Sequence, residues 1–340
     1  MPVLSFGATA TIGSLRYTGG IAAIRVTSAI GPGVGSARLS LPRDLRVDAK
    51  PGDDVTIALT GESREEVTAF TGSVSAVHRA LDQTVVLCGD ACAALAATRT
   101  GNTFEQQDAR AIANALAREA GVATGTVDLD LDLASYVADQ GRTALEHLTA
   151  LAGWGGAFVT AAEDGTVVVR KFPSPPADTA LRYGREIAEL GLTTNAPAAE
   201  VIWTGNGPAG DGSDPRAQLQ STGTLPDRAP GPAARTIRVA APALRTPAVA
   251  AAANQAYAGH NGAARLTSKC WLVPRLRAGT AVEIADAPTP ESSGPWLLTR
   301  VVHTVGPAPT GRTTFDAVSM AAVGGGGLLD LIAGAAGSLL

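Results

Sequence analysis

The sequence predicts a mainly β protein with an α+β insertion, in which two related β-barrel domains flank a small α+β domain. One observation is the concentration of β-branched and aromatic residues in short runs, such as 281–284 and 296–302, because these side chains suit a pleated, half-buried surface. The second is that this strand pattern occurs in both the N-terminal and the C-terminal region. The third is a change to helical periodicity between residues 101 and 172.

The two β regions follow the same order of motifs. In each region a glycine-containing turn precedes a strand, a polar gap and a second strand that contains histidine. The matched residues are Gly52 and Gly279, Val55-Thr56-Ile57 and Val282-Glu283-Ile284, and Val77-His78 and Val302-His303. We interpret this as two related β-domains. Two unrelated hairpins are the alternative, because self-similarity is a strong signal only with three or more copies.

Composition argues against several classes of protein. The formal net charge is −4 and the charges are interspersed, so stable nucleic-acid binding is not expected. The cysteines, Cys88, Cys92 and Cys270, are expected to be buried thiols rather than a disulfide framework. The scattered histidines predict no metal site, and no cofactor is expected. Without a leader peptide or an apolar run of about 18 residues, synthesis and assembly in the cytoplasm with no membrane span are expected.

Residues 1–100 are expected to form the first barrel. Apolar stretches at 21–27 and 36–41 alternate with polar residues and are separated by a Gly- and Pro-rich turn. With the first copy of the repeat they predict a sheet of about six strands. A small barrel is the simplest arrangement, because it leaves no open sheet edge.

Residues 101–172 are expected to form the inserted α+β domain. Two segments of the capping-box form, Thr103–Gln106 and Thr143–Glu146, each precede a helical pattern. Between them, 127–133 alternates Asp with apolar residues but lacks the Gly and Glu of a calcium-binding loop, so an extended segment with an acidic face is expected. Glu163-Asp164-Gly165 between two apolar runs predicts a hairpin.

Residues 173–322 are expected to form the second barrel, with a long loop at 205–234 whose Gly, Pro, Asp, Ser and Ala leave little to bury. An Ala-rich helix is expected at 246–259. Residues 323–340 are a glycine hinge and an apolar tail, which is too short to cross a bilayer. The tail is either a frayed terminus or a partner-binding segment, because an uncovered apolar patch is normally an interaction site. Its candidate partner-binding residues are Leu328, Leu329, Leu331, Ile332, Leu339 and Leu340.

The order of these parts resembles that of a known family. The parts are Pro51-Gly-Asp-Asp-Val55, Thr103–Ala109, Thr143–Trp154, the Asp-Gly hairpin, the Ala-rich helix, Pro274–Val282 and Arg300–His303. In this order they are similar to the late control D-like tail hub proteins of contractile phages, and to the hub portion of spike proteins in type VI secretion and extracellular contractile injection systems. The resemblance covers residues 21–319.

The resemblance implies a structural baseplate hub of a phage tail or a phage-derived injection particle. Such hubs are homotrimers in which each subunit contributes two tube-type β-barrels, so that six pseudo-equivalent barrels adapt a hexameric inner tube to a trimeric spike. Closed rings with repeated interfaces are usual for soluble assemblies. The implied partners are the inner tube protein, a spike protein, and the baseplate wedge and tape measure proteins. Because the chain ends at Leu340 without the further domains of fused hub-spike proteins, a separate spike protein is expected.

Two other classes of function are alternatives to a structural hub. A tail-associated cell-wall hydrolase would use His147 or His260 with a nearby acid, but Glu146 and His147 are adjacent on a helix and point to different faces. A carbohydrate- or receptor-binding tail module would expose tryptophans, which more often fill cores. Those in β regions are Trp203, Trp271 and Trp296. No catalytic residue is predicted, and the chain is not expected to be an enzyme.

Overall fold

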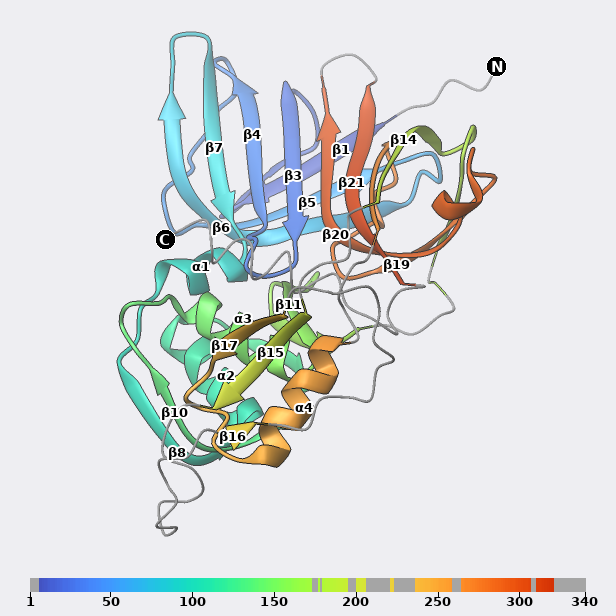
Figure 1. Cartoon of the computed structure of the whole chain (residues 1–340). Helices are drawn as coiled ribbons and strands as arrows, with labels where there is room; N and C mark the ends of the chain where they lie inside the picture. The colour runs from blue at the N-terminus through green and yellow to red at the C-terminus, as the bar shows by residue number, and fades with distance from the viewer. Residues whose placement is uncertain are drawn as a thin grey trace.

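The computed structural model describes residues 6–172, 177, 179–194, 200–205, 221–222, 236–258, 264–306 and 310–320. In this part the chain is mainly β, as the sequence predicts, and it contains four α-helices. A large β sheet forms one half of the molecule, and helices with smaller sheets form the other half (Figure 1). None of the described helices is both long enough and apolar enough to cross a membrane.

The large sheet has 13 strands, in the order β14-β18-β21-β20-β3-β4-β7-β6-β5-β1-β2, with β19 paired to β20 and β13 paired to β19. We call its N-terminal strands the first β unit; they are β1 (Gly7–Ile12), β2 (Leu15–Tyr17), β3 (Ala23–Ala29), β4 (Ser36–Pro42), β5 (Asp54–Thr60), β6 (Glu66–Arg79) and β7 (Gln83–Gly89). The remaining strands are the second β unit: β13 (Thr179–Arg182), β14 (Ile187–Thr193), β18 (Arg265–Trp271), β19 (Ala281–Ala285), β20 (Gly294–Val305) and β21 (Gly311–Ser319). A short 3-10 helix, Pro290–Ser292, precedes β20.

Each β unit encloses its own apolar core. Side chains alternate between the two faces of a strand, so Leu39, Ile57 and Val86 point to one side and form the first core. Figure 1 shows β1 and β5 running behind β3 and β4, and the sheet therefore curls around these residues. The second core contains Trp296 and Phe315.

The two β units share one sheet because β20 belongs to both. Its N-terminal residues pair with β19, from Ile284↔Gly294 to Ala281↔Leu297. Its C-terminal residues pair with β3, from Arg300↔Ala29 to Val305↔Ile24. The strands of the two predicted barrel domains are thus joined by a continuous antiparallel ladder.

The other half of the molecule, which we call the α/β unit, has a third core formed by four helices and three small sheets. Its helices are α1 (Ala91–Ala97), α2 (Ala109–Glu119), α3 (Ala144–Trp154) and α4 (Pro247–Ala258). Its strands are β8 (Asn102–Asp108), β9 (Thr124–Val127), β10 (Asp132–Ala138), β11 (Ala157–Ala161), β12 (Val167–Lys171), β15 (Glu200–Gly205), β16 (Ser221–Thr222) and β17 (Thr236–Ala240).

The α/β unit includes a segment that the sequence assigns to the second barrel domain. The rings of Trp203 on β15 and Trp154 on α3 meet edge to face, with centroids 6.2 Å apart. Leu244 and Ala250 are buried in the same core as α2 and α3. The side chain of Asn254 on α4 accepts a hydrogen bond from the Trp203 N–H at 2.7 Å. The described residues between 200 and 258 therefore pack with residues 91–171 and not with β18–β21.

One predicted helix begins later than its capping-box motif indicates. Residues 102–108 form β8, which pairs with β10, and α2 is capped by Asp108, whose Oδ1 accepts from the Ala111 N–H at 2.6 Å. The segment extends because Phe104 buries its ring in the core while its neighbours stay exposed. The second capping box is confirmed: the Glu146 N–H donates to Thr143 Oγ1 at 3.2 Å, and the Thr143 N–H donates to Glu146 Oε2 at 2.6 Å.

Two smaller predictions for the α/β unit are confirmed. β11 and β12 form an antiparallel hairpin around Gly165, which has a φ of 83°. In 127–133 the apolar residues are buried, and Asp130 is exposed and forms an ion pair with Lys171 at 2.7 Å. The predicted loop at 205–234 lies outside the described residues apart from 205 and 221–222.

Candidate assembly interface

The same turn occurs once in each β unit and is held by equivalent backbone hydrogen bonds. Gly52 has a φ of 94° and Gly279 a φ of 88°, a backbone conformation that favours glycine. The Gly52 N–H donates to the Val74 carbonyl at 2.8 Å, and the Gly279 N–H donates to the Leu298 carbonyl at 2.7 Å. The Val74 N–H returns a bond to the Asp53 carbonyl at 2.8 Å, as the Leu298 N–H does to the Thr280 carbonyl at 2.9 Å.

The strand order around this turn also repeats. In the first β unit the neighbours are β3-β4-β7-β6-β5, and in the second they are β14-β18-β21-β20-β19. All of these pairs are antiparallel. The repeat predicted from the sequence therefore extends to the topology of both β units.

Directly after the repeated turn, each unit has an irregularity at the same point of its long strand. The pairing of β6 with β7 shifts between Val74 and Ala76, and that of β20 with β21 shifts between Leu298 and Arg300. When the two irregularities are aligned, His78 corresponds to Val302. The sequence comparison matched His78 to His303, which is one residue further along β20. A one-residue change reverses the face of a strand, and accordingly His78 is exposed whereas His303 is buried.

The repeat leaves two strand edges open. Beyond its irregularity, β20 pairs with β3. The corresponding residues of β6, Ala76–Arg79, pair with β7 on one side and have no strand partner among the described residues on the other. β14, the counterpart of β3, pairs with β18 on one side, and its residues 189–193 have no strand partner on the other side among the described residues. Open edges present unpaired N–H and C=O groups to a further strand.

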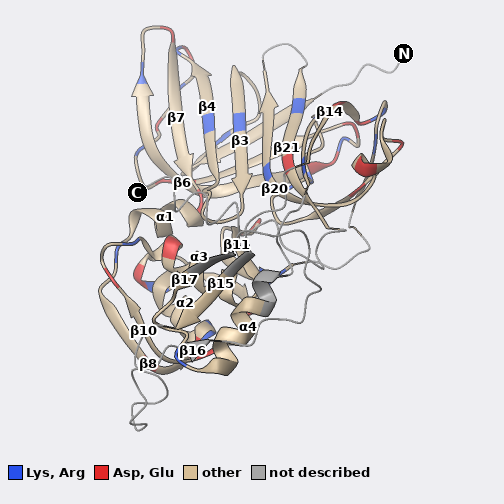
Figure 2. Cartoon of the chain, viewed as in Figure 1, with Lys and Arg blue, Asp and Glu red and all other residues tan. Residues whose placement is uncertain are grey.

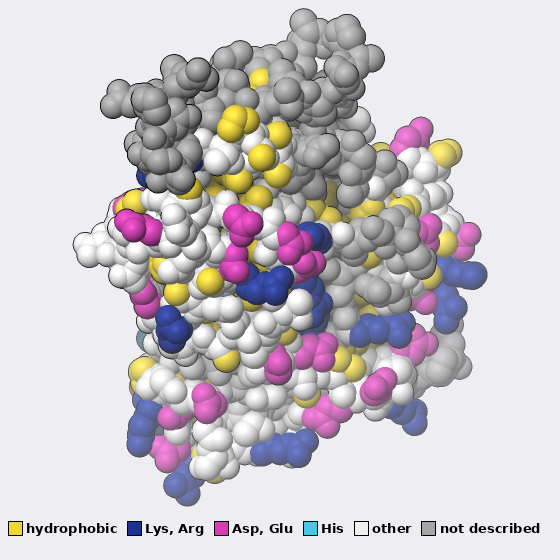
Figure 3. Space-filling model, turned by 90° about the horizontal axis from the view of Figure 1, so that it is seen from below, with side chains coloured by type: hydrophobic (Ala, Val, Ile, Leu, Met, Phe, Trp, Pro, Cys, Tyr) yellow, Lys and Arg dark blue, Asp and Glu magenta, His cyan; other side chains and the backbone are white. Residues whose placement is uncertain are grey.

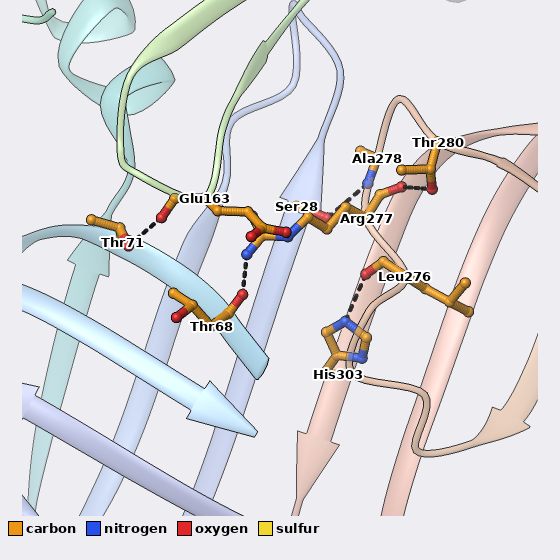
Figure 4. Close-up of polar contacts among 9 residues, drawn as sticks. All are labelled: Ser28, Thr68, Thr71, Glu163, Leu276, Arg277, Ala278, Thr280 and His303. Carbon is orange, nitrogen blue, oxygen red and sulfur yellow. Dashed lines mark hydrogen bonds and ion pairs between the residues drawn. The ribbon is translucent and has the colours of Figure 1, made fainter. Parts of the chain in front are cut away.

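A junction centred on Arg277 holds the three units together (Figure 4). Arg277 lies in the repeated turn of the second β unit, and its Nη2 donates to the Thr68 carbonyl on β6. Its Nε is 3.2 Å from Glu163 Oε1, at the tip of the β11–β12 hairpin. The Glu163 carbonyl accepts from Thr71 Oγ1 at 2.7 Å. One side chain of the second β unit thus contacts both the first β unit and the α/β unit.

His303 is a structural residue of the second β unit. Its Nε2 is 2.9 Å from the Leu276 carbonyl and its Nδ1 is 2.9 Å from Thr313 Oγ1. The carbonyl can only accept, so Nε2 carries the proton and Nδ1 accepts from the threonine hydroxyl. Burial lowers the pKa of His303 to about 4. The neutral ring therefore fixes the loop before the repeated turn, through Leu276, against β20.

The structure places the other predicted residues as follows. The apolar tail, with Leu328, Leu329, Leu331, Ile332, Leu339 and Leu340, lies outside the described residues, as does His260. His147 is buried, with its Nδ1 2.8 Å from the Tyr136 hydroxyl. All three cysteines are free and buried, as predicted, and burial raises the pKa of the Cys270 thiol to about 11. Among the described residues, no group of three or more His, Cys, Asp and Glu side chains could hold a metal ion.

A pocket and one face of the molecule are candidates for a ligand site. A pocket of about 360 Å³ lies beside the junction and is lined by Glu163, Asp164, Arg170 and Arg277, among others, but Glu163 and Arg277 are already paired. Figure 3 looks at the molecule from below and shows acidic and basic side chains next to one another over much of this face. Trp296 is buried and Trp271 is 48% exposed. The open edges, which carry no chemical motif, are the strongest candidate for a functional surface.

Comparison with known proteins places this architecture. No family model and no curated protein matches the sequence. The 43 kDa tail protein of prophage MuSo2 from Shewanella oneidensis is similar in structure, with a TM-score of 0.64 and 16% identity over 94% of this chain and 98% of that chain. A tail protein from Neisseria meningitidis has a TM-score of 0.67 and 13% identity over 94% of this chain and 99% of that chain.

A third similar structure is an Escherichia coli component of the type VI secretion system, itself described as similar to bacteriophage T4 tail proteins. Its TM-score is 0.60 and its identity 12%, over 91% of this chain and 76% of that chain. The resemblance to tail proteins found in the sequence is confirmed at the level of the fold. The chain has the fold shared by these phage tail proteins and the type VI secretion component.

Proposed function

We propose that this chain is a structural hub subunit of a phage tail or a phage-derived contractile injection system. Three copies would form a ring of six β units, each a tube-type barrel, that adapts a hexameric inner tube to a trimeric spike. The observation that carries the proposal is the pairing of β20 with β3, together with the open edges of β6 and β14 at the corresponding positions. The fold likeness to tail proteins supports it.

The β20–β3 ladder inside one chain is the template for the contact between chains. In it Val302 lies opposite Thr27. The repeated register makes His78 the counterpart of Val302, and the ladders β3–β4 and β14–β18 make Thr193 the counterpart of Thr27. If β14 of a second copy joins β6 in the same way, His78 lies opposite Thr193 of that copy. The contact is head-to-tail, so copies close a ring if the rotation allows.

The same register accounts for an exposed apolar side chain. Leu81 follows β6 and is 86% exposed. The extended ladder places it opposite Leu190 of the next copy, a partly buried residue that packs on the second core. Burying Leu81 would remove apolar surface from water, worth about 1.5–3 kcal/mol for a complete leucine side chain. Leu81 is therefore a candidate anchor of the interface.

The partners follow from this assembly. One surface of the ring would meet the inner tube protein and the other a separate spike protein, with baseplate wedge and tape measure proteins as further contacts. We propose the apolar tail, including Leu328, Leu329, Leu331, Ile332, Leu339 and Leu340, as an additional partner-binding segment. The role is structural and does not require catalysis or a cofactor.

Paired cysteine substitutions test the contact directly. His78→Cys and Thr193→Cys in one chain should form disulfides between copies, because Cα atoms opposite each other in an antiparallel pair are about 4.5–5.5 Å apart, within the range of a disulfide. Oxidised protein should show covalent dimers and trimers on a denaturing gel, and its native mass should be that of three chains. The measurement is made on the protein alone and with its tube protein.

The matched control carries Thr56→Cys in place of His78→Cys. Thr56 is an exposed residue of β5 in the same β unit. It should give no crosslink with Thr193→Cys, since β5 does not border the open edge. The native cysteines are buried and should not compete. A native mass of one chain under all conditions, or equal crosslinking of the control, would contradict the proposed ring.

A further inference from the structure

The outer face of the shared sheet carries an uncompensated row of arginines. Side chains on this face alternate with those of the first and second cores. Arg38 on β4 lies directly opposite Arg25 on β3. Arg25 lies opposite Thr304 on β20, which lies opposite Arg312 on β21. We call Arg38, Arg25 and Arg312 the arginine row; Figure 2 shows basic residues on these neighbouring strands.

Two other basic residues of this face, Lys269 and Arg300, have acidic neighbours. Lys269 forms an ion pair with Glu189 at 2.6 Å, and Arg300 lies opposite Asp316 in the ladder. The three side chains of the row are exposed. Within the described residues none of them takes part in a salt bridge or a side-chain hydrogen bond. The row is thus a local concentration of positive charge on a chain whose net charge is −4.

The arrangement is unfavourable without a ligand. Like charges directly opposite each other on a sheet are destabilising, and Arg25 and Arg38 are such a pair. A group that accepts hydrogen bonds from both guanidinium groups would remove this repulsion. Planar guanidinium groups bind carboxylates and phosphates with paired hydrogen bonds. The chemistry of the row therefore favours an anion.

The arginine row lies where the two β units join, at the pairing of β3 with β20, and the repeat does not duplicate it. The ladders match Arg25 to Gly191, Arg38 to Thr267 and Arg312 to Gln83 in the other β unit. These counterparts are uncharged. Each chain therefore has two β units but only one arginine row.

We propose that the arginine row binds an acidic segment of a partner polypeptide. The ends of the row are apolar: Leu87 lies opposite Arg38 and is 38% exposed, and Trp271 lies opposite Arg312. Strands are about 4.8 Å apart, so the three arginines span roughly 14 Å, the length of an extended segment of about four residues. Carboxylates at its centre and apolar side chains at its ends match this surface.

Nucleic acid fits the surface less well. A contact to three phosphates gives a binding constant that falls with salt with a logarithmic slope of only about −2.7, so binding is weak at physiological salt. Glu189 and Asp316 lie on the same face, beside the row, and would repel a continuous chain of phosphates. A short acidic segment avoids both residues.

Fluorescence anisotropy with defined probes tests the proposal. The first probe is a labelled peptide of Leu-Glu-Ser-Glu repeats, the second is the same peptide with Gln for every Glu, and the third is a labelled DNA duplex. The Glu peptide should bind the full-length protein at least about tenfold more tightly than the Gln peptide, since charge-assisted hydrogen bonds are stronger than neutral ones. Arg25→Gln with Arg38→Gln should weaken it by a similar factor.

Arg118→Gln is the matched control, because Arg118 is exposed and lies on α2 in the α/β unit; it should leave the affinity unchanged. Equal binding of the Glu and Gln peptides, an unaffected double variant, or no binding of the Glu peptide would overturn the proposal. So would DNA that binds at physiological salt as tightly as the Glu peptide and through the same arginines. The native mass of the double variant separates this result from the proposed ring, whose open edges lie elsewhere on the sheet.

Discussion

Gly52 and Gly279 occupy the same position in two copies of one turn, yet only Gly279 is pressed against another unit. A Cβ atom built on Gly279 would lie 2.6 Å from Cε2 of Phe158 on β11, whereas one built on Gly52 meets nothing within 4 Å. Both glycines satisfy a left-handed backbone, and Gly279 in addition lets the α/β unit approach the turn. Comparing the two glycines therefore distinguishes two reasons for glycine: the left-handed backbone of the turn, which both share, and the close packing against the α/β unit, which only Gly279 has.

We expect Gly279→Ala to be clearly more destabilising than Gly52→Ala. Gly52→Ala should cost about 1–2 kcal/mol for the left-handed conformation, and Gly279→Ala should cost about 1–3 kcal/mol more because of the overlap with Phe158. Free energies of unfolding from urea titrations measure the difference. Equal losses would show that Phe158 moves aside without cost.

Replacing Arg277 should weaken the contacts between the three units and lower the free energy of unfolding. Arg277→Met keeps much of the side-chain volume but leaves the Thr68 carbonyl without its donor, and we expect a loss of about 1–3 kcal/mol. Glu163→Gln is the matched variant; the Glu163 side chain is 64% exposed, so its loss should stay below about 1 kcal/mol. Limited proteolysis between the units would show the same order. A larger effect of Glu163→Gln would mean that the ion pair, and not the bond to β6, holds the junction.

The second β unit should lose stability in mild acid. The pKa of His303 falls from an ordinary value of 6.5 to about 4 in the folded chain. Below pH 6.5 the unfolded chain therefore takes up a proton that the folded chain does not, and the stability contribution present at neutral pH is lost progressively down to pH 4. The total is about 3 kcal/mol.

The control for this effect is His303→Gln, which removes the titrating group. Its free energy of unfolding should depend less steeply on pH between 6.5 and 4 than that of the natural chain, whatever its stability at pH 7. Parallel pH profiles of the two proteins would exclude His303 as the source.

Removing one arginine of the row should stabilise the free protein. Arg25→Thr relieves the repulsion with Arg38 and introduces a residue suited to strands, so we expect a gain of about 0.2–1 kcal/mol. Arg300→Thr is the matched control, since Arg300 lies opposite Asp316, and it should give no such gain. Arg25→Thr with Arg38→Thr should gain less than the sum of the single changes. Additive gains would show that the two guanidinium groups do not interact.

Local signals in the sequence predicted local structure where nothing competed with them. The capping box at Thr143 and the Asp-Gly hairpin are found as predicted. The similar motif at Thr103 failed because burial of Phe104 in a strand outweighs a capping interaction, and Asp108 supplies another cap. The helix α1 was missed because its alanines carry almost no periodic pattern.

Long-range features were predicted less well. The repeat was recognised, but its register was wrong by one residue at His78, because the segments between the repeated turn and the long strand differ in length: Gly52 bonds to Val74, 22 residues later, and Gly279 bonds to Leu298, 19 residues later. The packing of α4 on the α/β unit depends on contacts such as that between Asn254 and Trp203, which are distant in the sequence. The open edges consist of backbone groups, so no residue type identifies them. Leu81 lies next to one of these edges, but its exposure is visible only in the structure.

The sharing of β20 between two β units has a mechanical consequence. Its hydrogen bonds to β3 run perpendicular to both strands and extend from Arg300 to Val305. A pull that drags one unit past the other along the strand axis loads all of these bonds together in shear, whereas a hinge between separate domains would yield at a single linker. The two β units should therefore transmit force as one rigid body. Stretching a single chain between its two β units should give one high-force rupture rather than two weak ones.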